Sequence, residues 1–326
     1  MSTAIEKVQK TKVLTSTAIA EHLIAEIQEV QKAIQFATQK ANFYGRLCLF
    51  CNFGIGIFAF IAFWALQSVT NLALSSLFLR FVLFSLFLVL VFTILRIAFE
   101  ILRRNYEDVI VTVPEYRCEL AKYVLGVLGR DMDKYGMLDL CLKFKIDNSV
   151  VYTGLHPSKS GWRIDFYADD FLQVKGKLMD GTEFFIQFTE RMREKKGKNI
   201  NGKFRIKRVN KGMMISINLH TKESVYGNLL RFRKAYRHPD RNNQLIKIWQ
   251  GGYLHSLKFK PNSLRLKVGL PQALPLRYTP TVAFGANTRV ERQMEQLADV
   301  QKTFTSAMLS AYQVLNLARL LHQQAV

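Results

Sequence analysis

The sequence predicts an α+β membrane protein with a two-helix transmembrane hairpin, a cytosolic antiparallel β-meander domain, and long heptad-patterned helices at both ends. Three observations lead to this fold class. Residues 47–102 are almost continuously apolar. Much of 140–219 alternates apolar and polar residues with the period of two typical of strands. Both chain ends repeat apolar residues at spacings of three and four. The predicted parts are an N-terminal amphipathic helix (1–46), the transmembrane hairpin (47–104), a basic cytosolic α+β domain (105–270), a proline-containing linker (271–286) and a C-terminal amphipathic helix (287–326).

The apolar segment is long enough to cross a membrane twice. Residues 47–69 contain no charged residue, and roughly 20 residues suffice to span a hydrocarbon core. A second span is expected at 75–99, where Arg80 and Arg96 stand about 24 Å apart along a helix and can reach opposite interfaces. The connection at 67–76 is too short for a domain, so both termini are expected on one side.

Positive charges near the helix ends predict the orientation. Residues 67–76 contain no Lys or Arg, whereas basic residues flank the outer ends of both spans. By the positive-inside rule, both termini are cytoplasmic and the protein is integral to an inner or plasma membrane. The 46 residues before the first span do not resemble a cleavable signal peptide. The expected membrane-interface residues are Arg46, Arg80, Arg96, Arg103 and Arg104.

The first span carries a face of small or polar residues. With Cys48, the residues Asn52, Gly56 and Ala59 align on one side of a helix and would allow close helix packing. We expect that face to contact the second span of the same chain, with a pore or subunit contact as the alternative. Cys48 and Cys51 are interpreted as packing residues rather than a redox pair.

Heptad patterns at both ends predict helix packing. The N-terminal apolar positions run from Ala20 to Tyr44, and the C-terminal positions from Val290 to Ala318, with Gln301 as the polar position. Such a pattern predicts packing between helices but does not identify the partner. Packing within the chain and homo-oligomerisation are both open, and we expect a homo-oligomer through these helices.

The central domain is predicted to be helix followed by strands. A helix is expected at 115–128, and Asp180-Gly181 is the strongest hairpin turn. We interpret Asp169-Asp170 as a solvated turn. Further strands are expected at 140–146, 162–166, 172–179, 182–188, 204–209, 213–219, 245–249 and 264–268, with a helix at 221–236.

No catalytic signature is found, so a non-enzymatic protein without cofactor or metal is expected. Residues 197–203 match the first seven positions of a P-loop, but Phe204 follows instead of Ser or Thr, and a strand is predicted next. The six histidines have no ligand spacing. A lipid head-group enzyme using Asp165, Asp169 and Asp170 is the minority hypothesis.

Charge gives the functional prediction. From Arg103 onward the chain holds 38 Lys and Arg against 20 Asp and Glu, an excess that the positive-inside rule, which acts near helix ends, does not explain. We expect a cytosolic surface that binds a polyanion: anionic membrane lipid, nucleic acid or nucleotide. A membrane effector or channel gated by a phosphate-rich ligand is the alternative. The predicted polyanion-binding residues are Arg191, Arg193, Lys195, Lys196, Lys198, Lys203, Arg205, Lys207, Arg208 and Lys211. A second basic group comprises Arg231, Arg233, Lys234, Arg237 and Arg241.

Overall fold

The computed structural model describes residues 12–69, 76–110, 115–144, 150–155, 162–198, 202–232, 251–271 and 286–324. The chain divides into two compact units. The first contains Met1–Val30 and Pro114–Val326, and the second contains Gln31–Val113. Two long apolar helices packed as a hairpin, together with an antiparallel sheet, confirm the α+β part of the predicted fold class.

The second unit is a helical hairpin made by helix α2 (Ala20–Val69), which begins in the first unit, and helix α3 (Ser76–Ile110). Aromatic rings hold the two helices together, since Tyr44 stacks on Phe99 and Phe58 stacks on Phe92. Cys48 and Cys51 are buried and free, which confirms their interpretation as packing residues. By length and composition, both helices are able to cross a membrane.

The side of α2 that was expected to contact α3 is exposed instead. Asn52, Gly56 and Ala59 are exposed, and a Cβ atom added at Gly56 would meet nothing within 4 Å. The contact is made around Gly54, where a Cβ atom would come within 3.0 Å of the Phe92 ring. The intrachain contact predicted for Asn52, Gly56 and Ala59 is therefore wrong, because the absence of a side chain at Gly54 lets Phe92 pack against that side of α2.

The predicted membrane-interface residues fall into two groups. Arg46, Arg80 and Arg96 are exposed. Arg103 and Arg104 form ion pairs with carboxylates of the same helix, at 2.8 Å from Arg103 Nε to Glu107 Oε1 and 3.3 Å from Arg104 Nε to Glu100 Oε1. Pairs of this spacing on a helix surface contribute a few tenths of a kcal/mol each, so they support the end of α3 locally.

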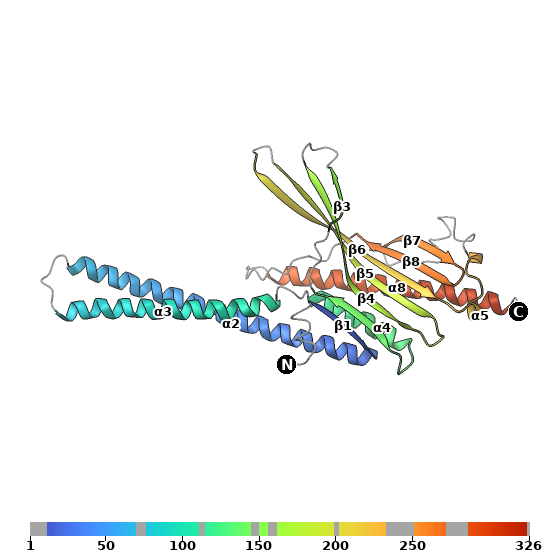
Figure 1. The fold of residues 1–326 in the computed structure, drawn as a ribbon, viewed down its shortest axis with the longest axis horizontal. Helices are drawn as coiled ribbons and strands as arrows, with labels where there is room; N and C mark the ends of the chain where they lie inside the picture. The colour runs from blue at the N-terminus through green and yellow to red at the C-terminus, as the bar shows by residue number, and fades with distance from the viewer. Residues whose placement is uncertain are drawn as a thin grey trace. The chain divides into compact units, whose positions relative to one another are not determined.

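The first unit contains a sheet in which every described pairing is antiparallel. The strand order is β1-β2-β4-β5-β6-β8-β7, and β3 also pairs with β4. Figure 1 shows the strands with helices α4 (Glu115–Arg130), α5 (Glu223–Tyr226) and α8 (Ala286–Gln323). The strands are β1 (Val13–Ala18), β2 (Leu138–Lys143), β3 (Val150–Leu155), β4 (Arg163–Lys177), β5 (Glu183–Lys198), β6 (Phe204–His220), β7 (Tyr253–Lys260) and β8 (Ser263–Leu270).

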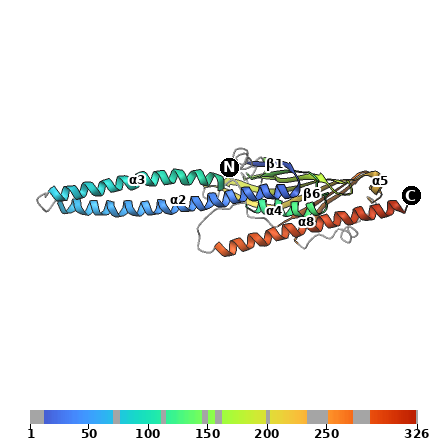
Figure 2. The ribbon, with the colours of Figure 1, turned by 90° about the horizontal axis from the view of Figure 1, so that it is seen from below.

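Helices α4 and α8 cover the same side of the sheet (Figure 2). Phe304 of α8 meets the Phe188 ring of β5 with ring centroids 5.6 Å apart. Apolar positions from both heptad patterns are buried in this unit, including Ile27 and Leu315, which are 0% and 2% exposed within one chain. The structure thus favours intrachain packing of these positions, while homo-oligomerisation stays a prediction.

Several predicted elements are merged or cut short. The strands expected at 162–166 and 172–179 form one strand, β4, so the solvated turn predicted at Asp169-Asp170 is wrong and Asp169 is fully buried. The helix expected at 221–236 ends after four residues, since Gly227 adopts a φ of 63°. The strand expected at 245–249 lies outside the described residues.

Strand β6 is also continuous where two strands were expected. Lys211 and Gly212 together oppose Arg191, which makes a bulge in the β5–β6 pairing. Gly212 has a φ of 91°, and a Cβ atom there would collide with the backbone of Leu270. The glycine lets β6 continue through the bulge rather than turn.

A buried ion-pair cluster joins helix α4 to strands β4 and β5. Arg117 Nη2 lies 2.7 Å from Asp169 Oδ2 and 2.8 Å from Glu190 Oε2, and all three side chains are almost completely buried. Arg117 Nη1 donates to the Lys143 carbonyl at 2.9 Å, and Tyr116 donates to Glu190. Burial and the neighbouring Glu190 raise the pKa of Tyr116 well above its ordinary value, so this hydroxyl remains a donor.

We predict that Arg117→Met destabilises the protein by about 3 to 5 kcal/mol, because it leaves two buried carboxylates without their cation. The measurement is denaturant or thermal unfolding of the full chain in detergent. The control is Arg163→Met, which removes a half-exposed partner of Asp165 and should cost about 1 kcal/mol or less. Equal effects of the two substitutions would contradict the central role of Arg117.

Candidate functional site

Strand β5 carries charges of opposite sign on its two faces. Successive side chains of a strand point to opposite faces, and β5 pairs continuously with β4 and β6 on either side. We call the face that Asp169 and Glu190 share with Arg117 the inner face, and the opposite one the outer face. Glu190 and Glu194 lie on the inner face, whereas Arg191, Arg193 and Lys195 lie on the outer face.

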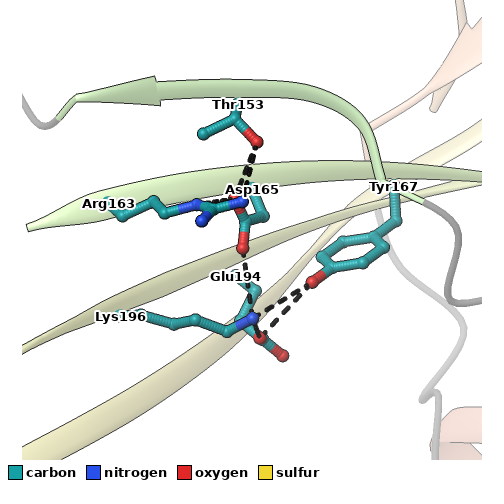
Figure 3. A network of polar contacts seen from close by, with 6 residues as sticks. All are labelled: Thr153, Arg163, Asp165, Tyr167, Glu194 and Lys196. Atoms are coloured by element: carbon teal, nitrogen blue, oxygen red, sulfur yellow. Dashed lines mark hydrogen bonds and ion pairs between the residues drawn. The ribbon is translucent and has the colours of Figure 1, made fainter.

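A second ion-pair cluster occupies the inner face further along the same strands. Asp165 and Glu194 face each other in the β4–β5 register and are almost completely buried. Lys196 joins them, with its Nζ atom 3.1 Å from Asp165 Oδ2 and 2.6 Å from Glu194 Oε1 (Figure 3). Arg163 and Thr153 also donate to Asp165 Oδ1, at 2.8 and 3.0 Å.

This cluster removes one residue from the predicted polyanion site. The hydrogen bonds to Glu194 and Asp165 raise the pKa of Lys196, which keeps it charged and held by carboxylates of its own chain. Arg208 occupies the register position opposite Glu194. Lys198, two residues beyond Lys196 on β5, lies on the same face as Lys196. Lys196 and Lys198 therefore do not share a face with Arg191, Arg193 and Lys195.

The outer face brings four predicted residues together from two strands. Arg191, Arg193 and Lys195 alternate along β5, and on β6 the register places Arg205 opposite Gly197. Lys207 pairs with Lys195 in the same register. The Nε atoms of Arg191 and Arg193 are shielded from solvent and have no hydrogen-bond partner among the described residues. Ion pairs between described residues do not include either arginine.

The register adds basic residues to the outer face that sequence reasoning missed. On β5, Phe185 lies between Lys175 of β4 and Asn218 of β6, and that row continues to Arg265 and Lys258. In the next row, Ser216 faces Lys267. These cations are isolated in the sequence, so only the strand order could have placed them beside the β5 arginines.

The remaining predicted residues lie at the margins. Lys198 ends β5, Lys203 precedes β6, Lys211 lies in the bulge, and all three are exposed. Arg231 is exposed, whereas Arg233, Lys234, Arg237 and Arg241 lie outside the described residues. Arg231 is therefore the one member of the second basic group that the structure describes.

The described residues show little sign of a phosphate-binding loop or a metal site. The P-loop-like glycines at 197 and 202 lie at the ends of β5 and β6, and a strand follows them as predicted. No group of three His, Cys, Asp or Glu residues that could hold a metal ion occurs among the residues described. A hollow of about 350 Å³ lies over β1, β2 and β4 and is lined by Thr15, Thr17, Asp139, Cys141, Gln173 and Lys175, among others.

We predict that Asp165→Asn makes the protein less stable at neutral pH, by about 1 to 3 kcal/mol, and less sensitive to acid. Burial raises the pKa of Asp165, but hydrogen bonds from Arg163, Lys196 and Thr153 outweigh it and lower the pKa. The stabilisation is therefore present above the ordinary aspartate pKa and is lost as the pH falls through the lowered value. Melting temperatures between about pH 7 and pH 2 measure it, and the exposed Asp133→Asn serves as the control. A melting curve of Asp165→Asn that falls with acid as steeply as that of the unaltered protein would contradict this assignment.

Arg191, Arg193 and Arg205 of the outer face form no ion pair among the described residues. The acidic residue Asp170 on this face accepts a hydrogen bond from Thr189 at 2.6 Å, and Arg191 donates to the Tyr253 hydroxyl at 3.1 Å. No protein-family model matches this chain, and no curated protein or solved structure is similar to it. The function is accordingly inferred from the side chains of this face.

Proposed function

We propose that this chain is a non-enzymatic integral membrane protein whose first unit binds a polyanion on its outer face. The observation that carries the proposal is the separation of charge across β4 and β5. The inner acids Asp165, Glu194, Asp169 and Glu190 each have a cation of the same chain. The outer cations Arg193 and Arg205 form no ion pair among the described residues, so their charge is free to attract an anion.

The size of the charge excess supports a large anion rather than a single phosphate. The chain from Arg103 onward has a net charge of +18, and a surface lined by one sign of charge raises the local concentration and association rate of an oppositely charged partner. On β5, outer-face cations recur every second residue, about 6.8 Å apart. Such a row suits a ligand with repeated negative groups.

Helices α2 and α3 support the membrane part of the proposal. Within the candidate spans, Ala20–Trp64 and Val82–Glu107, the most apolar windows of 18 residues have mean hydropathies of 2.1 and 2.6. Their apolar side chains include many that are more than half exposed, such as Phe53, Phe60 and Phe87. Lipid would cover these side chains, and the Lys and Arg residues beyond the outer ends of the spans support a cytoplasmic position of both termini.

We predict that Arg193→Gln, Lys195→Gln and Arg205→Gln together weaken heparin binding by about tenfold or more, since each basic side chain contributes about 1 kcal/mol near an anionic surface. The full chain in neutral lipid nanodiscs is titrated with heparin over a range of salt. The matched control replaces Arg130, Lys134 and Lys302, three exposed cations of α4, α8 and the turn after α4, by Gln. Equal losses in both triple variants, or no binding by the unaltered protein at low salt, would refute the outer face as a polyanion site.

The topology gives a separate prediction. Reporter fusions at the two termini should both be cytoplasmic, and a tag inserted at Thr70 should be labelled only from outside the cell. The positive charges at the outer ends of the two spans are the reason. Labelling of the two termini from opposite sides would contradict the two-span arrangement.

A further inference from the structure

Three aromatic side chains of the outer face each lie over a glycine. A Cβ atom at Gly197 would come within 2.5 Å of the indole ring of Trp162, so the ring occupies the space above that glycine. Such an arrangement covers one side of a ring with backbone and leaves its other side directed away from the sheet. The three pairs are Tyr152 with Gly154, Trp162 with Gly197, and Tyr253 with Gly269.

Two of these rings lie next to outer-face cations, and Phe166 separates the third, Tyr152, from Arg193. Tyr152 faces Phe166 across β3 and β4, with ring centroids 5.8 Å apart, and Phe166 faces Arg193 of β5. The Tyr253 hydroxyl accepts the hydrogen bond from Arg191. Gly197, beneath Trp162, faces Arg205 of β6. Tyr152 is 63% exposed and Tyr253 is 41% exposed, so solvent reaches both side chains.

The three rings lie in different rows of the sheet and on both sides of β5. Trp162 lies over Gly197, Tyr152 of β3 lies in the row of Arg193, and Tyr253 of β7 lies in the row of Thr189. Successive rows are four residues of β5 apart, which corresponds to about 14 Å along a strand. The β5 cations Arg191, Arg193 and Lys195 lie within the same rows and between them. A ligand that crosses the outer face therefore meets both π-surfaces and positive charges.

This pattern fits single-stranded nucleic acid better than a lipid surface. A strand-like ligand offers phosphates to the cations and unpaired bases to the rings, and proteins that bind single strands combine these two contacts. Binding to lipid favours exposed apolar residues on the same face as the cations. The exposed apolar residues of β6, Phe204 and Ile206, instead face Lys198 and Lys196 on the inner face.

We propose that the polyanion is single-stranded nucleic acid, with bases stacked on Tyr152, Trp162 and Tyr253 and phosphates held by Arg191, Arg193, Lys195 and Arg205. This inference rests on the proposed function and names its ligand class. The rings stack on the faces of bases and form no hydrogen bonds with base edges, so binding depends little on the nucleotide sequence. A duplex, whose bases are already paired and stacked, binds more weakly than a single strand.

The test compares Tyr152→Leu with Tyr152→Phe in the full chain held in neutral lipid nanodiscs. Leu removes the π-surface at an exposed position of β3, whereas Phe keeps it. Affinities are measured for labelled oligothymidine, for the same oligomer annealed to oligodeoxyadenosine, and for heparin, which has no bases. Melting temperatures verify that both variants are folded.

The expected result is a loss of about fivefold or more in oligothymidine affinity for Tyr152→Leu, little change for Tyr152→Phe, and unchanged heparin binding by both. Weaker binding of the duplex than of the single strand is expected as well. Equal oligothymidine affinity for Tyr152→Leu and the unaltered protein would overturn the inference. So would retention on phosphatidylserine vesicles that oligothymidine fails to displace.

The outcomes separate this inference from the proposed function. Heparin binding that depends on Arg193, Lys195 and Arg205 but is accompanied by no preference for oligothymidine would leave the polyanion site standing and refute the nucleic-acid ligand. Failure to bind heparin and oligothymidine alike would refute both. A purely structural role of Tyr152 in covering Gly154 would lower the melting temperature of Tyr152→Leu without a selective loss of oligothymidine binding, and that result would also refute the inference.

Discussion

The buried contact of Arg117 with Asp169 and Glu190 determines which way β4 and β5 face. Three ionised side chains that are almost completely buried must stay together, because separating them would leave charges uncompensated in the core. Helix α4 supplies the cation and the two strands supply the carboxylates, so the strand residues in register with these carboxylates must point toward the helix side. Since side chains alternate along a strand, every other residue of β5 then faces away from the helices. The inner position of Glu194 and the outer positions of Arg193 and Lys195 follow from this one constraint.

A second pair of facing carboxylates lies on the inner face, at a place where no described helix supplies the cation. Asp165 and Glu194 face each other as Asp169 and Glu190 do, and two like charges in facing positions are destabilising unless a cation lies between them. Here the cation is Lys196, a residue of β5 itself. The strands can therefore carry a second pair of buried carboxylates using their own side chains. A consequence is that this inner stretch retains little free charge of either sign, whereas Arg191 and Arg193 on the outer side form no ion pair among the described residues.

Local signals in the sequence predict local elements well, and contacts between distant segments account for what they miss. Asp180-Gly181 forms the expected turn, with Gly181 at a φ of 82°, and α4 ends at Arg130, two residues past the expected Leu128. Strand β1 lies within residues 1–46, which the heptad pattern predicts as a helix, and that prediction is wrong for Val13–Ala18. Val13, Thr15 and Thr17 alternate as strand residues do, but the partner strand β2 lies more than 100 residues further along the chain. The sequence predicts a turn at Asp169 because nothing nearby in the chain neutralises its charge. The cation that pairs with it in the core, Arg117, lies 52 residues earlier. The ten basic residues of the candidate site were visible as a cluster, but their division between two faces depends on register, and Arg265 and Lys267 join the outer face only through β8 pairing with β6.

The arrangement of cations on the outer face carries an energetic cost in the free protein. Arg191, Arg193 and Lys195 occupy alternate positions of β5 on one face, about 6.8 Å apart. Like charges that are neighbours on one face of a sheet repel each other, and the inner carboxylates draw their cations from Arg117, Lys196 and Arg163 rather than from this row. Proteins depart from locally favourable choices mainly at functional sites. An anion lying along this face would relieve the repulsion, so the same residues that disfavour the free sheet favour the bound one, and ligand binding is expected to stabilise the strands that carry them.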